Sequence, residues 1–548
     1  MKSKASQTAT RKRKNSERAD WTVMVYLAGD NSLTDECVYS LTEMKKAREK
    51  AGSRINVIAQ FDPKDSHLPT SRLRITRDPR AGSLGEDIID TSRSGRTEGD
   101  GKSRFREESE AAKDLESRIA ANAPPKANSK DLGLIGIVDT PDSGPEGGET
   151  DTGDPVTLFN FISLGIEKFR AERYMVVLSG HAAGTEENFL LKDDSSARSL
   201  TIPKLRAVFK EIQDCFGDLK NEGPVIDILG MDACCMSMAE IAYELKGLVK
   251  TVVASESYSP AAGWPYREIL EKLEFSFTGA RIRGSNVHSE FAKSIVDAFI
   301  NFYADYTLGG LSVDQAALDV GAAEGLKDVV KELADALVAE LQNESAYKPQ
   351  KRPTQSFKDA LLLAHWEAQS YSGELFVDLR DFCECLRTRY PVGKVAKACN
   401  TVIEFIKSET FVLTSAYSGP VYQYSHGVSI YFPWASVAPF YKRNLEFATE
   451  SGWADFLELY TNETRRPPRV ERRISRKTAK LLNANSTPVD NKIIDANASV
   501  PRRFRQVGEK GADNPIISMR NPPIVFLPDK HIKLKRTAIR AQKKLFLD

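Results

Sequence analysis

Four stretches of the 548-residue sequence decide its fold: WTVMVYLAGD (21–30), INVIAQFD (55–62), YMVVLSGH (174–181) and VIDILGMD (225–232). In each, a run of apolar and β-branched residues ends in small or polar residues, which is typical of a buried strand. Residues 33–46 have the apolar spacing of an amphipathic helix, with Asn31 as its candidate cap. This strand–helix–strand order predicts an α/β fold with a mostly parallel open sheet flanked by helices.

Later segments continue the alternation. The sequence predicts helices at 155–169, 202–216 and 236–246, and a short strand at 251–254. Because open α/β sheets bind their ligands beyond the carboxyl ends of the strands, we expect the functional site at the edge where these strands end.

Composition divides the chain further. Residues 1–20 are basic and expected to be disordered, and 21–308 form the α/β domain. Within that domain, residues 79–131 are polar and too poor in apolar side chains to supply a core, so we interpret them as an insertion.

Long helical patterns dominate the second half, for example at 323–342 and 395–406. With one further strand at 427–433, they predict a helix-rich C-terminal region over 309–461. Residues 462–548 lack sustained periodicity and are interpreted as an extended basic tail.

The formal net charge of +1 hides an asymmetry. Residues 1–20 hold seven basic and two acidic side chains, and 462–548 hold 21 and 8, which leaves 49 basic and 66 acidic side chains in 21–461, a net charge of −17. The negative charge of residues 21–461 favours cationic ligands electrostatically. The sparse aromatic residues of the basic tail argue against nucleic acid as a partner.

No stretch reaches the roughly 18 apolar residues of a membrane helix, and the basic start has no apolar core like that of a signal peptide. We therefore expect a cytoplasmic location and no membrane partner. Seven cysteines, an odd number without regular spacing, favour free thiols over a disulfide framework.

His181 and Cys234 are the candidate pair for nucleophilic catalysis. Each follows an apolar strand, and Gly180 and Gly184 beside the histidine allow a substrate to approach closely. A helical pattern follows Cys234, and a helix N-terminus would favour its thiolate. Taken alone, a cysteine there is more often a core residue, and a histidine is as often a loop residue without function. Two neighbouring strands would bring both to one edge.

A resemblance to a known family rests on a series of ordered blocks. They are WTVMVYLAGDNSL (21–33), NVIAQFD (56–62), ETDTGDPVTLFNFI (149–162), VVLSGHAAG (176–184), LGMDACCMSMAEIAYEL (229–245), VVASESYSPAAGWPY (252–266), VDLRDF (377–382), GVSIYFP (427–433) and FATESGWADFLELY (447–460). In this order they resemble the signature blocks of the clostripain family of cysteine peptidases, which shares the caspase-like fold with gingipains, legumains and caspases.

The resemblance implies a cysteine endopeptidase that cuts protein or peptide substrates after arginine or lysine, with His181 as general base and Cys234 as nucleophile. Asp232, in the same block, would lie at the base of the specificity pocket, where a wrong side chain leaves a buried charge uncompensated. The backbone N–H groups of Ala182 and Cys234 would stabilise the oxyanion. Asp232 could instead cap a helix.

Several alternatives stay open. Cys235 is the second candidate nucleophile, although one step along the chain aims the side chain elsewhere. Ala182 stands where the family usually has glycine, which would matter if the position needs a positive φ. Ser255 and Glu256 could line the pocket, or Glu256 could be a solvated loop acid. The alternative function is a catalytically silent caspase-like scaffold that acts through its insertion and tail.

Relatives are commonly activated by self-cleavage between the histidine and cysteine strands. The matching loop here is KDDSSARSL (192–200), with Arg198 as the first candidate for the cleaved position and Lys192 as the second. Some relatives need calcium, and PDSGPEGGETDTGD (141–154) concentrates oxygen ligands, but without the spacing of an EF-hand. Calcium is thus a possible cofactor, with no metal ligand assigned.

Overall fold

The computed structural model describes residues 18–47, 54–64, 70–75, 151–185, 190–220, 222–279, 286–307, 311–346 and 356–465. The predicted insertion at 79–131 lies outside the described residues, as do nearly all of the N-terminal segment 1–20 and of the tail 462–548.

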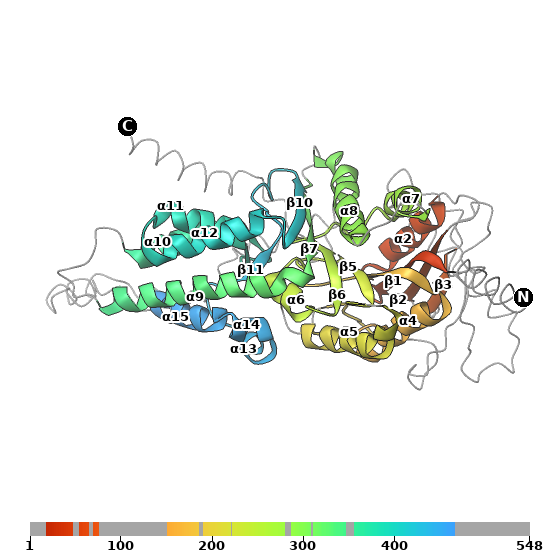
Figure 1. The fold of residues 1–548 in the computed structure, drawn as a ribbon, viewed down its shortest axis with the longest axis horizontal. Helices are drawn as coiled ribbons and strands as arrows, with labels where there is room; N and C mark the ends of the chain where they lie inside the picture. Colours follow the sequence, from red (N-terminus) through yellow and green to blue (C-terminus); the bar gives the residue numbers. More distant parts are fainter. Residues whose placement is uncertain are drawn as a thin grey trace, which may run out of the picture.

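An eight-stranded sheet forms the centre of the fold (Figure 1), with the strand order β10-β7-β6-β5-β4-β1-β2-β3. The strands are β1 (Ala19–Gly29), β2 (Ile55–Pro63), β3 (Ser71–Arg74), β4 (Ala171–Ser179), β5 (Ile226–Asp232), β6 (Val249–Ala254), β7 (Val313–Asp319) and β10 (Val412–Ser418). The five strands β2, β1, β4, β5 and β6 run parallel, whereas β3, β7 and β10 pair antiparallel with β2, β6 and β7. This confirms the predicted mostly parallel open sheet.

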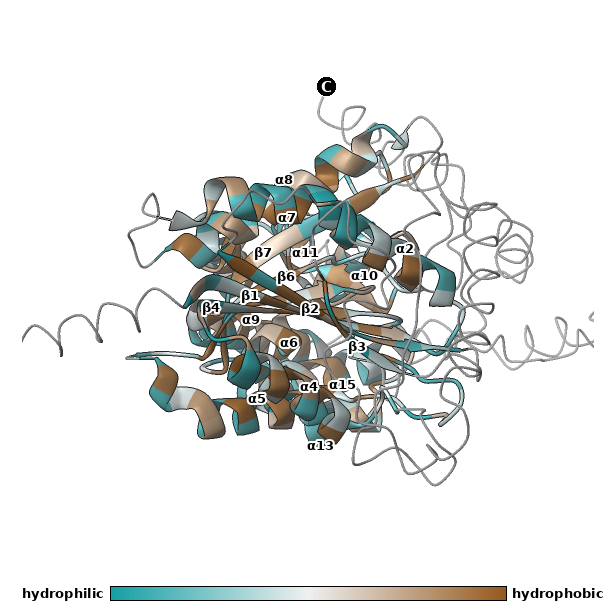
Figure 2. Cartoon of the chain, turned by 90° about the vertical axis from the view of Figure 1, so that its right-hand side faces the viewer, coloured by the Kyte–Doolittle hydropathy of each residue, from teal (hydrophilic) through white to brown (hydrophobic). Residues whose placement is uncertain are grey.

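Helices cover both faces of the sheet (Figures 1 and 2). One face carries α2 (Thr34–Lys46), α7 (Tyr266–Ser276) and α8 (Val287–Ala304), and the other carries α4 (Pro155–Lys168), α5 (Ile202–Phe216) and α6 (Ala239–Glu244). Alternate residues of a strand point to opposite faces, so both faces need an apolar core. In β4, for example, Met175 and Val177 belong to one buried cluster, and Val176 and Leu178 belong to the other.

The C-terminal region packs beside this sheet and completes it. Its helices are α9 (Ala323–Ala346), α10 (Phe357–Glu367), α11 (Leu379–Arg389), α12 (Gly393–Lys407), α13 (Pro439–Asn444), α14 (Glu446–Glu450) and α15 (Trp453–Arg465). A small sheet has the order β11-β9-β8, with β8 (Ser370–Tyr371), β9 (Phe376–Asp378) and β11 (Ser429–Tyr431). Short 3₁₀ helices lie at η3 (Gly217–Leu219) and η6 (Val320–Ala322).

The strand content after residue 309 differs from the prediction of one strand. The structure has β7 and β10 in the large sheet and β8, β9 and β11 in the small one. β8 and β9 are only two and three residues long, too short to show a period in sequence. The position of the predicted boundary between 308 and 309 stays a prediction, while strands from both sides of it belong to one sheet.

Local boundaries also differ in two places. The helix predicted over 236–246 begins only at Ala239 and ends at Glu244. Leu33, not Asn31, occupies the N-cap of α2, and the Asn31 side chain accepts a hydrogen bond from the Leu33 N–H at 2.9 Å. Among the described helices, none combines the length and the apolar content that crossing a membrane requires.

Candidate active site

The histidine and cysteine segments leave the sheet side by side. β4 and β5 are parallel neighbours, with Ser179 paired to Asp232 at their carboxyl ends. The Gly180 N–H donates to the Asp232 carbonyl at 3.3 Å, which extends the pairing past the strand ends. His181 follows two residues after Ser179, and Cys234 follows two residues after Asp232. The prediction that neighbouring strands bring the two segments to one edge is confirmed.

His181 is half-buried and is held by its own loop and by the loop after β1. Its carbonyl accepts a hydrogen bond from the Leu191 N–H at 2.8 Å. Its ring Nε2 lies 3.1 Å from the Ser32 Oγ, within hydrogen-bonding distance. Ser32 therefore fixes one ring nitrogen of the candidate base, a contact that the sequence interpretation missed.

Residues 234–238, here called the nucleophile turn, connect β5 to α6 in an irregular conformation. Cys235 has a positive φ of 57°, unusual for a residue with a side chain. The turn is stabilised by backbone hydrogen bonds from Cys235 N–H to the Ser257 carbonyl at 2.8 Å and from Met236 N–H to the Ser255 carbonyl at 2.9 Å. The left-handed residue aims Cys234 and Cys235 in different directions.

The Cys234 side chain is fully buried, and its sulfur accepts a hydrogen bond from the Ser259 N–H at 3.3 Å. The expectation that a helix N-terminus favours the thiolate is wrong, because α6 begins only at Ala239 and is six residues long. A backbone N–H aimed at the sulfur is instead the observed donor, and such a donor favours the anionic form of an acceptor. Ser259 was not predicted.

Asp232 ends β5 with a fully buried side chain. Its Oδ2 accepts hydrogen bonds from the Ser179 Oγ at 3.0 Å and the Tyr266 Oη at 2.9 Å. Asp232 does not cap a helix, because the next helix begins seven residues later at Ala239. Two hydroxyl groups from β4 and α7 therefore orient this carboxylate beside the nucleophile turn.

The segment after His181 packs tightly. Ala182 is buried and is not among the described non-glycine residues with a positive φ, so its methyl group causes no left-handed strain. Gly184 has a φ of +61°, and a Cβ there would come within 2.6 Å of the Phe376 ring and 2.8 Å of the Met238 sulfur. The histidine loop thus contacts both the nucleophile turn and the small sheet. The roles of the Ala182 and Cys234 N–H groups as oxyanion donors stay predictions.

Ser255 and Glu256, which follow β6, are both buried. The Ser255 Oγ donates to the Gln315 Oε1 at 2.5 Å. The Glu256 Oε2 accepts a hydrogen bond from the Gly427 N–H at 2.7 Å, at the contact between the large sheet and the C-terminal region. Glu256 is therefore not a solvated loop acid, and the role of both residues in binding substrate stays a prediction.

The candidate cleavage loop forms a closed hairpin. Leu190 and Leu200 pair as an antiparallel bridge, and the Asp193 N–H donates to the Arg198 carbonyl at 3.0 Å. The side chain of Arg198 is 69% exposed and that of Lys192 44%. Burial raises the pKa of Asp193, although the hydrogen bonds that its carboxylate accepts from the backbone N–H groups of Ser196 and Thr152 act in the opposite direction. The loop presents its basic side chains to solvent while its backbone is tied down.

Metal sites were sought in the same part of the chain. In the ranges that the structure describes, no three or more His, Cys, Asp and Glu side chains are grouped so that they could hold a metal ion. Most of the oxygen-rich segment 141–154, considered above for calcium, lies outside those ranges, at 141–150. All seven cysteines of the chain lie inside them and are free thiols.

The four contacts that the sequence interpretation missed come from separate parts of the chain. They come from the loop after β1 (Ser32), from β4 (Ser179), from the segment after β6 (Ser259) and from α7 (Tyr266). Ser32 follows the first predicted strand at the same edge as His181, which is the one signal that could have indicated it.

Comparisons with known proteins show the family of the chain. The model of the clostripain family matches residues 25–460. Clostripain from Hathewaya histolytica is 24% identical over 292 residues, which are 50% of this chain and 45% of that protein, so the match covers less than half of the relative.

Solved structures are similar as well. A secreted C11 cysteine protease from Bacteroides thetaiotaomicron, in complex with an irreversible peptide inhibitor, is 16% identical, covers 80% of this chain and 100% of that chain, and has a TM-score of 0.50. An inactive zymogen C11 protease from Parabacteroides distasonis is 16% identical over 79% of this chain and 98% of that one, with a TM-score of 0.49. The caspase-like α/β fold is confirmed. With a family model that matches from β1 to α15, the chain belongs to the clostripain family of cysteine peptidases.

Proposed function

We propose that this chain is a cysteine endopeptidase that hydrolyses peptide bonds after arginine or lysine, with Cys234 as nucleophile and His181 as general base. The observation that supports it best is the in-register pairing of β4 and β5, which carries both residues out of the sheet at one level. Asp232, at the end of β5, is the proposed partner of the basic substrate side chain.

The chemistry follows from these roles. His181 takes the proton of the Cys234 thiol, and the thiolate attacks the scissile carbonyl carbon. The tetrahedral oxyanion is stabilised by backbone N–H groups, for which those of Ala182 and Cys234 are our candidates. The imidazolium then protonates the leaving amine, the acyl–sulfur intermediate is hydrolysed by water, and the thiol and the neutral imidazole are restored.

Self-processing is part of the proposal. The loop 190–200 lies between the His181 and Cys234 strands, and Arg198 is its most exposed basic side chain, ahead of Lys192. Cleavage after Arg198 requires the loop to open, because the Arg198 carbonyl accepts a hydrogen bond from the Asp193 N–H.

Fluorogenic peptides ending in Arg, Lys or Asp test the proposal with purified wild type, Cys234→Ala, His181→Ala and Asp232→Asn. We expect turnover of the Arg and Lys peptides only. Cys234→Ala and His181→Ala should lose at least about a thousandfold in kcat. Asp232→Asn should lose about a hundredfold in kcat/KM, since truncating one partner of a buried charge pair costs roughly 2–5 kcal/mol.

Cys235→Ala is the matched control, because it removes the neighbouring buried thiol and leaves Cys234 in place. We expect it to keep most of the activity. Full activity in Cys234→Ala with loss in Cys235→Ala would reassign the nucleophile, and turnover of the Asp peptide alone would overturn the pocket assignment.

A further inference from the structure

The nucleophile turn is held on one side by the segment that follows β6. The Ser255 carbonyl accepts hydrogen bonds from the N–H groups of Met236 and Ser237, both at 2.9 Å, and the Ser257 carbonyl accepts one from Cys235 at 2.8 Å. Three consecutive N–H groups of the turn are thereby satisfied by this segment. Its position sets the conformation of the turn.

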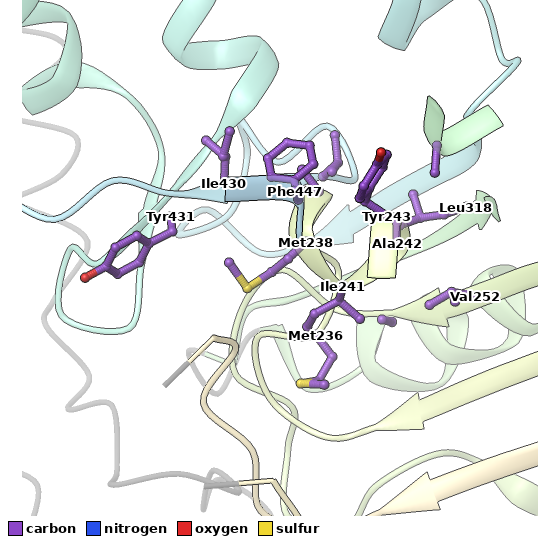
Figure 3. Packing of buried hydrophobic residues seen from close by; sticks show 14 of the residues in the cluster. Met236, Met238, Ile241, Ala242, Tyr243, Val252, Leu318, Ile430, Tyr431 and Phe447 are labelled. Carbon is purple, nitrogen blue, oxygen red and sulfur yellow. The ribbon is translucent and has the colours of Figure 1, made fainter. Parts of the chain in front are cut away.

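On its other side the turn is held by β11 of the C-terminal region. The Ser237 Oγ donates to the Gly427 carbonyl at 2.7 Å, and the Ser429 N–H donates to the Ser237 carbonyl at 2.9 Å. Met238 and Ser429 form a parallel bridge. Figure 3 shows Met236 and Met238 in this packed cluster together with Ile430 of β11.

Glu256 connects these two supports. Its own N–H donates to the Asp314 Oδ2 at 2.8 Å, and the Asp314 Oδ1 accepts the N–H of Ser257 at 3.0 Å, which fixes the segment to β7. Its Oε2 accepts the Gly427 N–H at 2.7 Å. Gly427 has a φ of +100°, and a Cβ there would come within 2.8 Å of Ser415, so the backbone packs closely against β10 at this point.

A second buried carboxyl group, that of Asp378, lies close enough for its charge to raise the pKa of Glu256. Asp378 is fully buried and accepts hydrogen bonds from His426, from its N–H at 2.5 Å and from its ring Nδ1 at 3.1 Å. Because neighbouring buried carboxylates repel each other, the charge of Asp378 favours the neutral, protonated form of Glu256.

The charged and titratable surroundings agree with this assignment. Burial raises the pKa of Glu256 well above its usual range, and the charges of Asp378 and Asp314 raise it further. Burial raises the pKa of Asp314 to about 6. Burial lowers the pKa of His426, but the negative charge of Asp378 and its hydrogen bond to the ring have the larger combined effect. The pKa of His426 is therefore raised. The titratable and charged groups near Glu256 are Asp378, Asp314 and Tyr371, and those near His426, the partner of Asp378, are Asp378, Arg380 and Asp381.

We propose that Glu256 is a positioning residue for Cys234: its buried carboxyl group accepts the Gly427 N–H and its backbone N–H donates to Asp314, and together these bonds clamp the chain before β11 and the segment after β6 onto the nucleophile turn. The C-terminal region is thereby part of the catalytic apparatus. This inference rests on the proposed function and replaces substrate binding as the role of Glu256. Ionisation of Glu256 beside Asp378 opens the clamp and misplaces the thiol.

Glu256→Gln and Glu256→Ala test the clamp. Glutamine stays neutral and can still accept the Gly427 N–H, whereas alanine removes this bond. We expect Glu256→Ala to lower kcat more than tenfold with KM within twofold of wild type. Glu256→Gln should have most of the wild-type kcat and a KM within twofold of wild type. The kcat of wild type should fall as pH rises from 6 to 9, and that of Glu256→Gln should fall less.

A readout without peptide separates this inference from the proposed function. The alkylation rate of Cys234 by iodoacetamide, followed by mass-spectrometric peptide mapping, should rise at least fivefold in Glu256→Ala, because the buried thiol becomes exposed. If wild type hydrolyses no peptide, the proposed function fails while this rate still tests the clamp. An unchanged alkylation rate in Glu256→Ala overturns the clamp.

Glu268→Gln is the matched control, since Glu268 on α7 also has a pKa raised by burial but faces Glu43. It should keep the wild-type pH profile and alkylation rate. A tenfold rise of KM for Arg and Lys peptides in Glu256→Gln, with an unchanged pH profile, would show that Glu256 binds substrate and would overturn the positioning role.

Discussion

Ser32, in the loop after β1, contacts the candidate base. Its Oγ lies 3.1 Å from the His181 Nε2. A neutral hydrogen bond contributes about 1 kcal/mol, so Ser32→Ala should lower kcat about fivefold. KM should stay unchanged, because Ser32 orients the base and does not hold the substrate.

Steady-state kinetics on the best Arg or Lys peptide would measure this change. Ser408→Ala is a suitable control, because Ser408 is an exposed residue at the end of α12 whose Oγ bonds only within its own turn. Equal kcat values in Ser32→Ala and wild type would show that Ser32 does not orient the ring.

Which site residues the sequence could predict follows from how each is placed. His181, Asp232 and Cys234 follow apolar runs directly, so their position at a strand end is visible in the sequence. Ser259 and Tyr266 reach the same site through contacts 25 and 34 residues away along the chain. Such contacts depend on how a loop folds back onto the site. A single sequence contains no periodic pattern of apolar residues from which this path could be predicted.

The closed hairpin 190–200 should resist the self-cleavage proposed above until it opens. Its ends are bridged at Leu190 and Leu200, and the hydrogen bond from the Asp193 N–H to the Arg198 carbonyl closes its turn. A peptidase binds its substrate extended, so the loop must open first. We expect a slow cut after Arg198, visible as two fragments in wild type, absent in Cys234→Ala and strongly reduced in Arg198→Ala.

N-terminal sequencing of purified protein identifies the new end, which should begin at Ser199. Lys192→Ala is the control, because the Lys192 carbonyl accepts a hydrogen bond from the Asn31 side chain and its side chain is less exposed. A fully active wild type that remains one intact chain would contradict self-processing.

Elements were predicted well where a pattern was long and poorly where it was short. The predicted helix at 202–216 coincides with α5, and the apolar strands match β1, β2, β4 and β5 to within a few residues. The helix expected from 236 was too long, because Met236 and Ser237 use their N–H groups on the Ser255 carbonyl. Tertiary hydrogen bonds outweighed local helical spacing there.

At the scale of the whole molecule, buried acids join the C-terminal region to the large sheet. Glu240, at the start of α6, accepts hydrogen bonds on Oε1 from the Tyr431 N–H at 2.9 Å and the Tyr441 Oη at 2.8 Å. Burial raises the pKa of Glu240 to about 7. The pKa values of Glu256 and Asp314 at the same junction are also raised. The contact between the C-terminal region and the large sheet is therefore stabilised when these carboxyl groups are protonated.

The stability of the whole chain should therefore fall with rising pH. A group whose pKa is higher in the folded state than in the unfolded state stabilises the fold fully when the pH is below its unfolded-state pKa. This contribution is lost as the pH rises to the folded-state pKa. For Glu240 the window runs from 4.5 to about 7, and a shift of this size corresponds to about 3 kcal/mol.

Urea unfolding of wild type and Glu240→Gln at pH 5 and pH 8 tests this prediction. Glutamine stays neutral and can still accept the Tyr431 N–H. The free energy of unfolding should therefore decrease between pH 5 and pH 8 by about 3 kcal/mol less in the variant than in wild type. Glu324→Gln should follow wild type, because the pKa of this exposed carboxylate is lowered to about 2 and it stays charged throughout this range. The same pH dependence in Glu240→Gln and wild type would mean that Glu240 is already ionised in the folded protein, with its charge stabilised by the Tyr431 N–H and the Tyr441 hydroxyl.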